Sequence, residues 1–208
     1  TTVLFDPALK SDSLMISGEL IGGAALSRVG AFLDLVRHLA HQDLHARVES
    51  ANNFPAGAGI ASSASAFAAL ALASAAAIGL RLSQKELSRL ARRGSGSASR
   101  SVPDGFVEWQ AGEADEDSYA FTIAPADHWD LADLICVLDS SHKTVGSTAG
   151  HALAATSPLH AARQQGIKDQ VDLCRGAILN RDFDLFAKVV EEDSEFMHAV
   201  MRTSTPAL

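Results

Sequence analysis

Hydrophobic side chains recur with two different periods along the chain, and each period predicts a type of secondary structure. Short runs in which apolar and polar positions alternate predict strands at residues 2–5, 14–17 and 45–50. Residues 24–40 instead carry their apolar side chains three or four positions apart, which predicts an amphipathic helix packed on a sheet. The first part of the chain is therefore expected to form a small sheet covered by a helix.

Alanine dominates the next helical segment, residues 62–78, whose small side chains allow close contact with neighbours on most sides. This composition is typical of a central, buried helix. Gly79 follows as a plausible end of the helix, because glycine adopts the left-handed conformation without strain. Ser83 and Glu86 then have the spacing of a capping box and predict a shorter helix through residue 92.

Two further strands, residues 106–110 and 119–123, flank an acidic turn at residues 113–117. We expect this turn to be the solvated tip of a hairpin. The continuous apolar run at residues 134–138 predicts a fully buried strand. Residues 142–150 are polar and interrupted by glycine, which indicates a loop that could face a substrate.

From residue 160 onward the period is helical, with one helix to about residue 179 and a second at residues 182–201. Strands come first and helices later, without regular alternation. This order favours an α+β arrangement of two layers over a doubly wound parallel sheet. We expect two domains, residues 1–125 and residues 126–208.

Composition and charge narrow the class of protein. Hydrophobic residues make up 47% of the 208 positions and charged residues 20%, so the chain is globular rather than disordered. The net charge of -8 argues against nonspecific nucleic-acid binding, which needs many cations. An anionic ligand therefore needs a local positive site, and Arg92, Arg93 and Arg100 supply one beside Ser95 and Ser97.

Cysteine usage and hydropathy indicate a compartment. Cys136 and Cys174 lack metal-ligand spacing and are expected to be buried, reduced thiols of a cytosolic protein. No basic segment typical of a signal peptide is visible at the start of the sequence. Residues 51–80 carry no charge, but their proline, serines and many alanines argue against a membrane span.

A glycine-rich segment lies between the strand at residues 45–50 and the alanine-rich helix, and it reads Asn-Asn-Phe-Pro-Ala-Gly-Ala-Gly-Ile-Ala-Ser-Ser-Ala-Ser over residues 52–65. Glycines allow a close backbone approach to a ligand, and the first N–H groups of the helix attract an anion. This pattern indicates a phosphate site. An ordinary capped helix start, with Ser62 or Ser63 as the N-cap, is the alternative. Neither the P-loop lysine nor the dinucleotide-binding glycine spacing is present.

This segment resembles the central phosphate loop of the GHMP small-molecule kinases, and its initial Asn-Asn-Phe narrows the resemblance to the diphosphomevalonate decarboxylase family. A second block, residues 92–112, is similar to the Gly-Ser-Gly-Ser-Ala-Cys-Arg-Ser and Gly-Gly-Phe-Val-Glu-Trp signatures of that family. The resemblance runs from about residue 44 to the end. It implies a GHMP kinase fold, with a phosphate-binding N-terminal domain that resembles a domain of a ribosomal protein, and part of a C-terminal domain.

The resemblance also implies an activity. The family uses ATP and Mg²⁺ to phosphorylate the tertiary hydroxyl of phosphorylated mevalonate, expels phosphate and releases carbon dioxide to form the alkene of the isoprenoid pathway. A cytoplasmic homodimer that binds neither nucleic acid nor membranes is expected.

The same resemblance assigns roles to individual residues. It gives the ATP phosphates to Ala58, Gly59, Ser62 and Ser63, with the Ser63 hydroxyl near Mg²⁺. It gives the substrate to Ser95, Ser97, Arg100, Ser147 and Thr148, and catalysis to Arg100 and Ser63. The planar guanidinium of Arg100 suits the substrate carboxylate, because it forms two parallel hydrogen bonds. Taken alone, Arg100 has a surface ion pair as its alternative role.

Several positions depart from the family pattern. Ser99 replaces the usual cysteine and Asp104 the usual glycine, and the added carboxylate leaves room for a monophosphate substrate. The family's N-terminal Asn, Tyr and Lys and its late Asp-Ala-Gly-Pro-Asn motif have no counterpart in the 208 residues, so we expect a fragment of a longer enzyme. The alternatives are a mevalonate 3-kinase without decarboxylation and an inactive phosphate-binding fragment.

Overall fold

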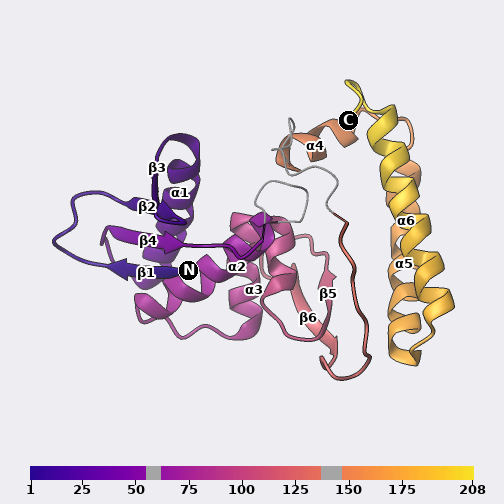
Figure 1. Cartoon of the computed structure of the whole chain (residues 1–208), viewed down its shortest axis with the longest axis horizontal. Coiled ribbons are helices and arrows are strands. Elements are labelled where there is room, and N and C mark those ends of the chain that lie inside the picture. Colours follow the sequence, from indigo (N-terminus) through magenta and orange to yellow (C-terminus); the bar gives the residue numbers. More distant parts are fainter. Residues whose placement is uncertain (55–61, 137–146) are drawn as a thin grey trace. The chain divides into compact units, whose positions relative to one another are not determined.

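Figure 1 shows the computed structural model of the chain, which describes residues 1–54, 62–136 and 147–208. The described residues fall into two compact units. The first is Thr1–Pro125, and the second contains Ala126–Cys136 and residues 147–208.

A four-stranded sheet with the order β1-β4-β2-β3 forms one layer of the first unit (Figure 1). Strand β4 pairs antiparallel with β1 and parallel with β2, and β2 and β3 form an antiparallel hairpin. The hairpin turn uses Ser17 and Gly18, both with positive φ. The strands are β1 (Thr2–Phe5), β2 (Ser13–Ile16), β3 (Glu19–Ile21) and β4 (Ala46–Ser50). Strands β1, β2 and β4 confirm the prediction, whereas β3 was missed.

Two helices cover one face of this sheet, α1 (Gly23–Ala40) and α2 (Ser62–Ala77). The strands present every second side chain to the helices, so that Val3, Val48 and Leu14 lie side by side in register and are buried. The rings of Phe32 on α1 and Phe67 on α2 meet edge to face, with centroids 5.5 Å apart. Burial of this apolar surface is the main stabilising contribution to the unit.

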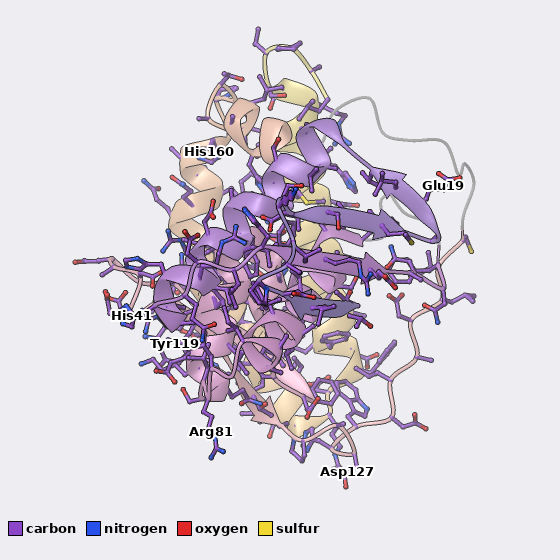
Figure 2. All side chains as sticks on the ribbon, turned by 90° about the vertical axis from the view of Figure 1, so that its left-hand side faces the viewer. Glu19, His41, Arg81, Tyr119, Asp127 and His160 are labelled. Atoms are coloured by element: carbon purple, nitrogen blue, oxygen red, sulfur yellow. The ribbon has the colours of Figure 1, made fainter. Side chains whose placement is uncertain are left out.

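Polar side chains occupy the rim of the first unit. Figure 2 shows Glu19, His41 and Arg81 at the surface, and all three are exposed.

In helix α2, seven residues on several sides are buried: Ala64, Phe67, Ala68, Leu70, Ala71, Ser74 and Ala75. The prediction of a central alanine-rich helix is therefore confirmed, and the helix gives way to Gly79 at φ +83°.

The remainder of the first unit carries the second sequence block. Helix α3 (Gln84–Gly94) begins with the predicted capping box, in which Ser83 and Glu86 exchange side-chain to backbone hydrogen bonds of 3.3 and 2.7 Å. The short 3-10 helix η1 (Gly96–Ser101) follows directly. Strands β5 (Phe106–Gln110) and β6 (Tyr119–Ala124) then form the predicted antiparallel hairpin.

The described part of the second unit contains three helices, α4 (Ser147–Ala154), α5 (His160–Asn180) and α6 (Phe183–Thr203). Helices α5 and α6 form a hairpin tied by an ion pair of 2.6 Å between Arg163 and Asp193. The Asp182 side chain caps α6 by accepting a hydrogen bond from the Leu185 N–H at 3.0 Å. Both predicted C-terminal helices are thus confirmed.

Three predictions for the region after residue 130 were wrong where the structure describes it. Residues 134–136 form no strand, and Leu134 is 88% exposed, because the described part of the second unit contains no strand with which they could pair. Residues 137 and 138 lie outside the described residues. A loop was predicted at residues 142–150, but helix α4 begins at Ser147. Residues 142–146 lie outside the described residues. Cys136 is exposed and Cys174 half-buried, so neither thiol is fully buried.

Within residues 1–54, 62–136 and 147–208, no helix is both long and apolar enough to cross a membrane.

A buried ion pair fastens the loop between β1 and β2 to helix α1. The Arg37 guanidinium donates to both Asp12 carboxylate oxygens, at 3.1 and 3.0 Å, and the Ala46 N–H donates to the same carboxylate at 2.8 Å. Burial alone would raise the pKa of Asp12, but the hydrogen bonds from Arg37 and Ala46 and the Arg37 charge outweigh it and lower the pKa below 3.8. Asp34 also contacts Arg37 but is exposed.

Replacing Asp12 by Asn should therefore destabilise the chain by about 1–3 kcal/mol at neutral pH, because Arg37 loses its buried counter-charge. The matched variant Asp34→Asn, at a carboxylate with 71% side-chain exposure, should cost less than about 1 kcal/mol. The pKa of Asp12 is lower in the folded than in the unfolded protein. The Asp12 charge therefore stabilises the fold at a pH above the unfolded-state pKa, and this stabilisation is lost as the pH falls. Urea unfolding should show the Asp12→Asn deficit narrowing between about pH 5 and about pH 2. A deficit that does not change over this range would contradict the role of the Asp12 charge.

Candidate anion-binding site

The first turn of α2 and the turn that begins η1 meet, although 32 residues separate them. The Ser63 hydroxyl lies 3.4 Å from the Ser95 hydroxyl, and both side chains are half-buried. Ser62 and Ser97, also half-buried, are their neighbours on the two segments. The structure therefore brings together the predicted ATP-phosphate and substrate segments where Ser63 meets Ser95.

Gly94 permits this approach because it has no side chain. A Cβ at this position would overlap the Phe67 ring of α2. The Arg28 guanidinium lies over the same ring, 4.5 Å from its centroid, and donates a 2.7 Å hydrogen bond to the Gly94 carbonyl. The Phe67 ring is thus held between Phe32, Arg28 and the backbone at Gly94.

The electrostatics of the junction favour an anion. Helix α2 has no acidic residue in its first turn, where the positive end of the helix dipole lies. Arg100 is exposed in the last turn of η1, and no residue in the described part of the chain forms an ion pair with it. Its guanidinium donors therefore remain available for a planar anion such as a carboxylate.

The prediction that Arg92 and Arg93 contribute free positive charge was wrong. The predicted acidic turn is exposed at residues 113, 114, 116 and 117, but Asp115 is half-buried. Asp115, in that turn, forms ion pairs with Arg89 at 2.7 Å, with Arg92 and with Arg93 at 3.8 Å. Burial by itself would raise the pKa of Asp115, but the Arg89 hydrogen bond and the charges of Arg92, Arg89 and Arg93 lower it. Three arginines on one face of α3 thus surround one carboxylate of the hairpin, whereas Arg100 forms no ion pair within the described residues.

The structure does not describe the side chains of the other four predicted site residues, Ala58, Gly59, Ser147 and Thr148. Ala58 and Gly59 lie outside the described residues. Ser147 and Thr148 begin α4 in the second unit, but their side chains lie outside the described part, so their assignment to the substrate stays a prediction.

A Mg²⁺ site made by protein ligands alone is absent from the described residues, among which no three His, Cys, Asp or Glu side chains cluster. Mg²⁺ bound with a nucleotide usually takes one or two protein oxygens and completes its shell with phosphates and water. The Ser63 hydroxyl at the start of α2 fits such a site.

The sequence analysis did not identify two residues that contact the segments of this site. They are Arg28, which contacts Gly94, and Ser88, which contacts Ser99. Arg28 lies on α1, far from either motif in sequence, and no local signal indicates its contact with Gly94. Ser88 could have been predicted, because its spacing of three positions from Ala91 places it on the buried face of α3. A polar residue on a buried face needs a hydrogen-bond partner.

Solved structures share this fold over almost the whole chain, and they define the class as the GHMP kinase fold. A crystal structure of mevalonate diphosphate decarboxylase from Staphylococcus aureus superposes with a TM-score of 0.89 and 38% identity, over 99% of this chain and 63% of that one. A structure described as MDDEF in complex with MVAPP, AMPPCP and magnesium has the same TM-score, with 35% identity over 99% of this chain and 64% of that one.

The particular family follows from sequence matches. Residues 1–120 match the diphosphomevalonate decarboxylase-like N-terminal domain, and residues 133–208 match the mevalonate 5-diphosphate decarboxylase C-terminal domain. Diphosphomevalonate decarboxylase of Ganoderma lucidum is 40% identical over 100% of this chain and 56% of its own length. Phosphomevalonate decarboxylase of Haloferax volcanii is 38% identical over 98% of this chain and 62% of its own. The chain belongs to the diphosphomevalonate decarboxylase family and spans less than two thirds of these relatives' lengths.

Replacing Gly94 by Ala should separate the two halves of the site, since the new methyl group would occupy the space of the Phe67 ring. We expect a loss of about 1–3 kcal/mol in the free energy of unfolding, typical of overpacking. Gly166→Ala is the matched control, because Gly166 also lies in a helix and nothing is within 4 Å of a Cβ there. Thermal unfolding of both variants measures the difference, and equal stability would show that Gly94 is not a point of close approach.

Proposed function

We propose that the protein is an ATP-dependent decarboxylase of phosphorylated mevalonate, which forms isopentenyl phosphate or diphosphate. The observation that carries the proposal is the contact of Ser63 with Ser95, which joins a helix N-terminus to the turn that bears Arg100. Membership of the diphosphomevalonate decarboxylase family supports the substrate class. We assign the first unit to the phosphate-binding domain and the second to part of the C-terminal domain.

The chemistry assigns each segment a task. A tertiary hydroxide leaves poorly, so the hydroxyl oxygen first takes the terminal phosphoryl group of ATP. The carbon–oxygen bond then breaks with loss of phosphate, and the carbon–carbon bond to the carboxylate breaks to give carbon dioxide and the alkene. The first turn of α2, with Ser62 and Ser63, binds the ATP phosphates through N–H and hydroxyl donors. Ala58 and Gly59 would extend this cradle.

Arg100 binds the carboxylate that departs as carbon dioxide, and Ser95 and Ser97 donate hydrogen bonds in the same pocket. The guanidinium holds the carboxylate in one plane while positive charge develops on the tertiary carbon that loses the phosphate. Ser147 and Thr148 would contact the phosphate groups of the substrate. The Ser63 hydroxyl would contact Mg²⁺, whose role when bound is to neutralise the ATP phosphates.

The substrate is proposed to carry one or two phosphates. The related protein of Haloferax volcanii is a phosphomevalonate decarboxylase, and that of Homo sapiens is a diphosphomevalonate decarboxylase. Asp104, exposed after η1, repels a diphosphate more than a monophosphate, because the repulsion grows with the charge of the ligand. This favours inclusion of the monophosphate. We further propose a cytoplasmic homodimer with no nucleic-acid or membrane partner.

The test of this function is to incubate the purified protein with ATP, Mg²⁺ and mono- or diphosphorylated mevalonate labelled at the carboxyl carbon. We expect equimolar release of ADP, phosphate and labelled carbon dioxide. ADP release with a retained phosphoester and no carbon dioxide would instead identify a 3-kinase. Absence of both ADP and carbon dioxide would identify a phosphate-binding protein without turnover.

Replacing Arg100 by Ala should lower kcat/KM for decarboxylation by about two or more orders of magnitude, because the carboxylate loses its paired donors. Arg100→Lys should be intermediate, since lysine keeps the charge but not the planar fork. Arg81→Ala, at another exposed arginine of the first unit, is the control and should retain the activity. Unchanged carbon dioxide release by Arg100→Ala would remove Arg100 from the site.

A further inference from the structure

Ser88 lies at the point where three elements of the first unit meet. It belongs to α3 and is fully buried, with 0% of its surface exposed. Its hydroxyl donates to the Ser99 carbonyl of η1 at 3.0 Å and accepts from the Ala120 N–H of β6 at 2.8 Å. One side chain therefore connects α3, η1 and the β5–β6 hairpin.

The carbonyl that Ser88 holds belongs to the peptide unit between Ser99 and Arg100. A peptide unit is planar, so fixing its oxygen also fixes the direction in which the backbone enters Arg100. The last carbonyls of a short 3-10 helix have no partner inside the helix, and Ser88 supplies one for Ser99. The Ser99 hydroxyl, donating to the Gly96 carbonyl at 2.9 Å, ties the other end of η1.

We propose that Ser88 is a positioning residue for the anion-binding turn: its buried hydroxyl holds the Ser99–Arg100 peptide unit and so sets where the Arg100 guanidinium projects. This inference rests on the proposed role of Arg100 in carboxylate binding. Ser88 does not contact the ligand itself. It acts through the backbone of Arg100.

The chain offers a matched control in Ser74. This serine is equally buried, at 0% exposure, but its hydroxyl donates at 2.5 Å to Leu70 within its own helix. Ser74→Ala therefore removes the same atom from a buried helical position without releasing η1. Ser88→Cys provides a second variant of similar size, because a thiol is a weak donor and acceptor.

Ser88→Ala should raise the KM for the carboxylate substrate and lower kcat, together by about 10- to 100-fold in kcat/KM, as expected for a misplaced binding group. The KM for ATP should change little, because the ATP phosphates bind at α2. A loss of folded protein alone would lower the apparent kcat and leave both KM values unchanged. Ser88→Cys should lie between wild type and Ser88→Ala, and Ser74→Ala should match wild type.

A second measurement does not depend on turnover. In ¹⁵N-labelled protein without substrate, the backbone amide and side-chain Nε–H resonances of Arg100 should shift in Ser88→Ala or Ser88→Cys and not in Ser74→Ala. Unshifted Arg100 resonances, or an unchanged substrate KM in an active Ser88 variant, would overturn the positioning role. If wild-type protein released no carbon dioxide, the proposed function would fail, and the Arg100 resonances would still decide whether Ser88 positions this residue.

Discussion

The close approach of the α3 backbone at Gly94 to the Phe67 ring of α2 is the constraint on which the rest of the site depends. Because Gly94 has no Cβ, the end of α3 lies directly against the Phe67 ring, and the next residue, Ser95, comes within 3.4 Å of Ser63. Phe67 itself packs on Phe32 in the core. The position of the anion-binding turn is therefore tied to the packing of α1 and α2 on the sheet, and a ligand would meet a site that folding has already assembled.

The charges of the first unit are divided between structure and ligand binding. Arg89, Arg92 and Arg93 all contact Asp115, so these cations hold the hairpin to α3. Arg100, only a few residues further along, has no such partner among the described residues. The proposed anion site of a protein with a net charge of -8 would thus depend on local positive charge, from a helix N-terminus and the guanidinium of Arg100.

The sequence predicted much of this arrangement where local signals are strong. The alternation of Ala46 and Val48 with charged residues indicated a one-sided strand, and the capping box at Ser83 marked the start of α3 correctly. Motif resemblance assigned the serines of α2 to the ATP phosphates and those at η1 to the substrate, and the structure brings Ser63 of the first segment next to Ser95 of the second. The assignments of Ala58, Gly59, Ser147 and Thr148 stay predictions.

What the sequence did not reveal depends on contacts between distant segments. Nothing near Asp115 indicates that three arginines of α3 surround it, so it was read as solvated. Leu134 and Ile135 have the apolar character of a strand, but a strand also needs a partner, which the described part of the second unit does not contain. Arg28 contacts Gly94 across 66 residues, a separation at which no periodicity helps.

The proposal that the α2 N-terminus and the η1 turn bind anions together is tested most directly by an NMR titration of the ¹⁵N-labelled protein with inorganic pyrophosphate. If the α2 N-terminus and the η1 turn form one anion pocket, the backbone amides of Ser63 and Ser95 will shift together and yield the same Kd. Shifts confined to one of the two segments, or two different Kd values, would show that the segments bind anions separately or not at all, and would contradict a single pocket.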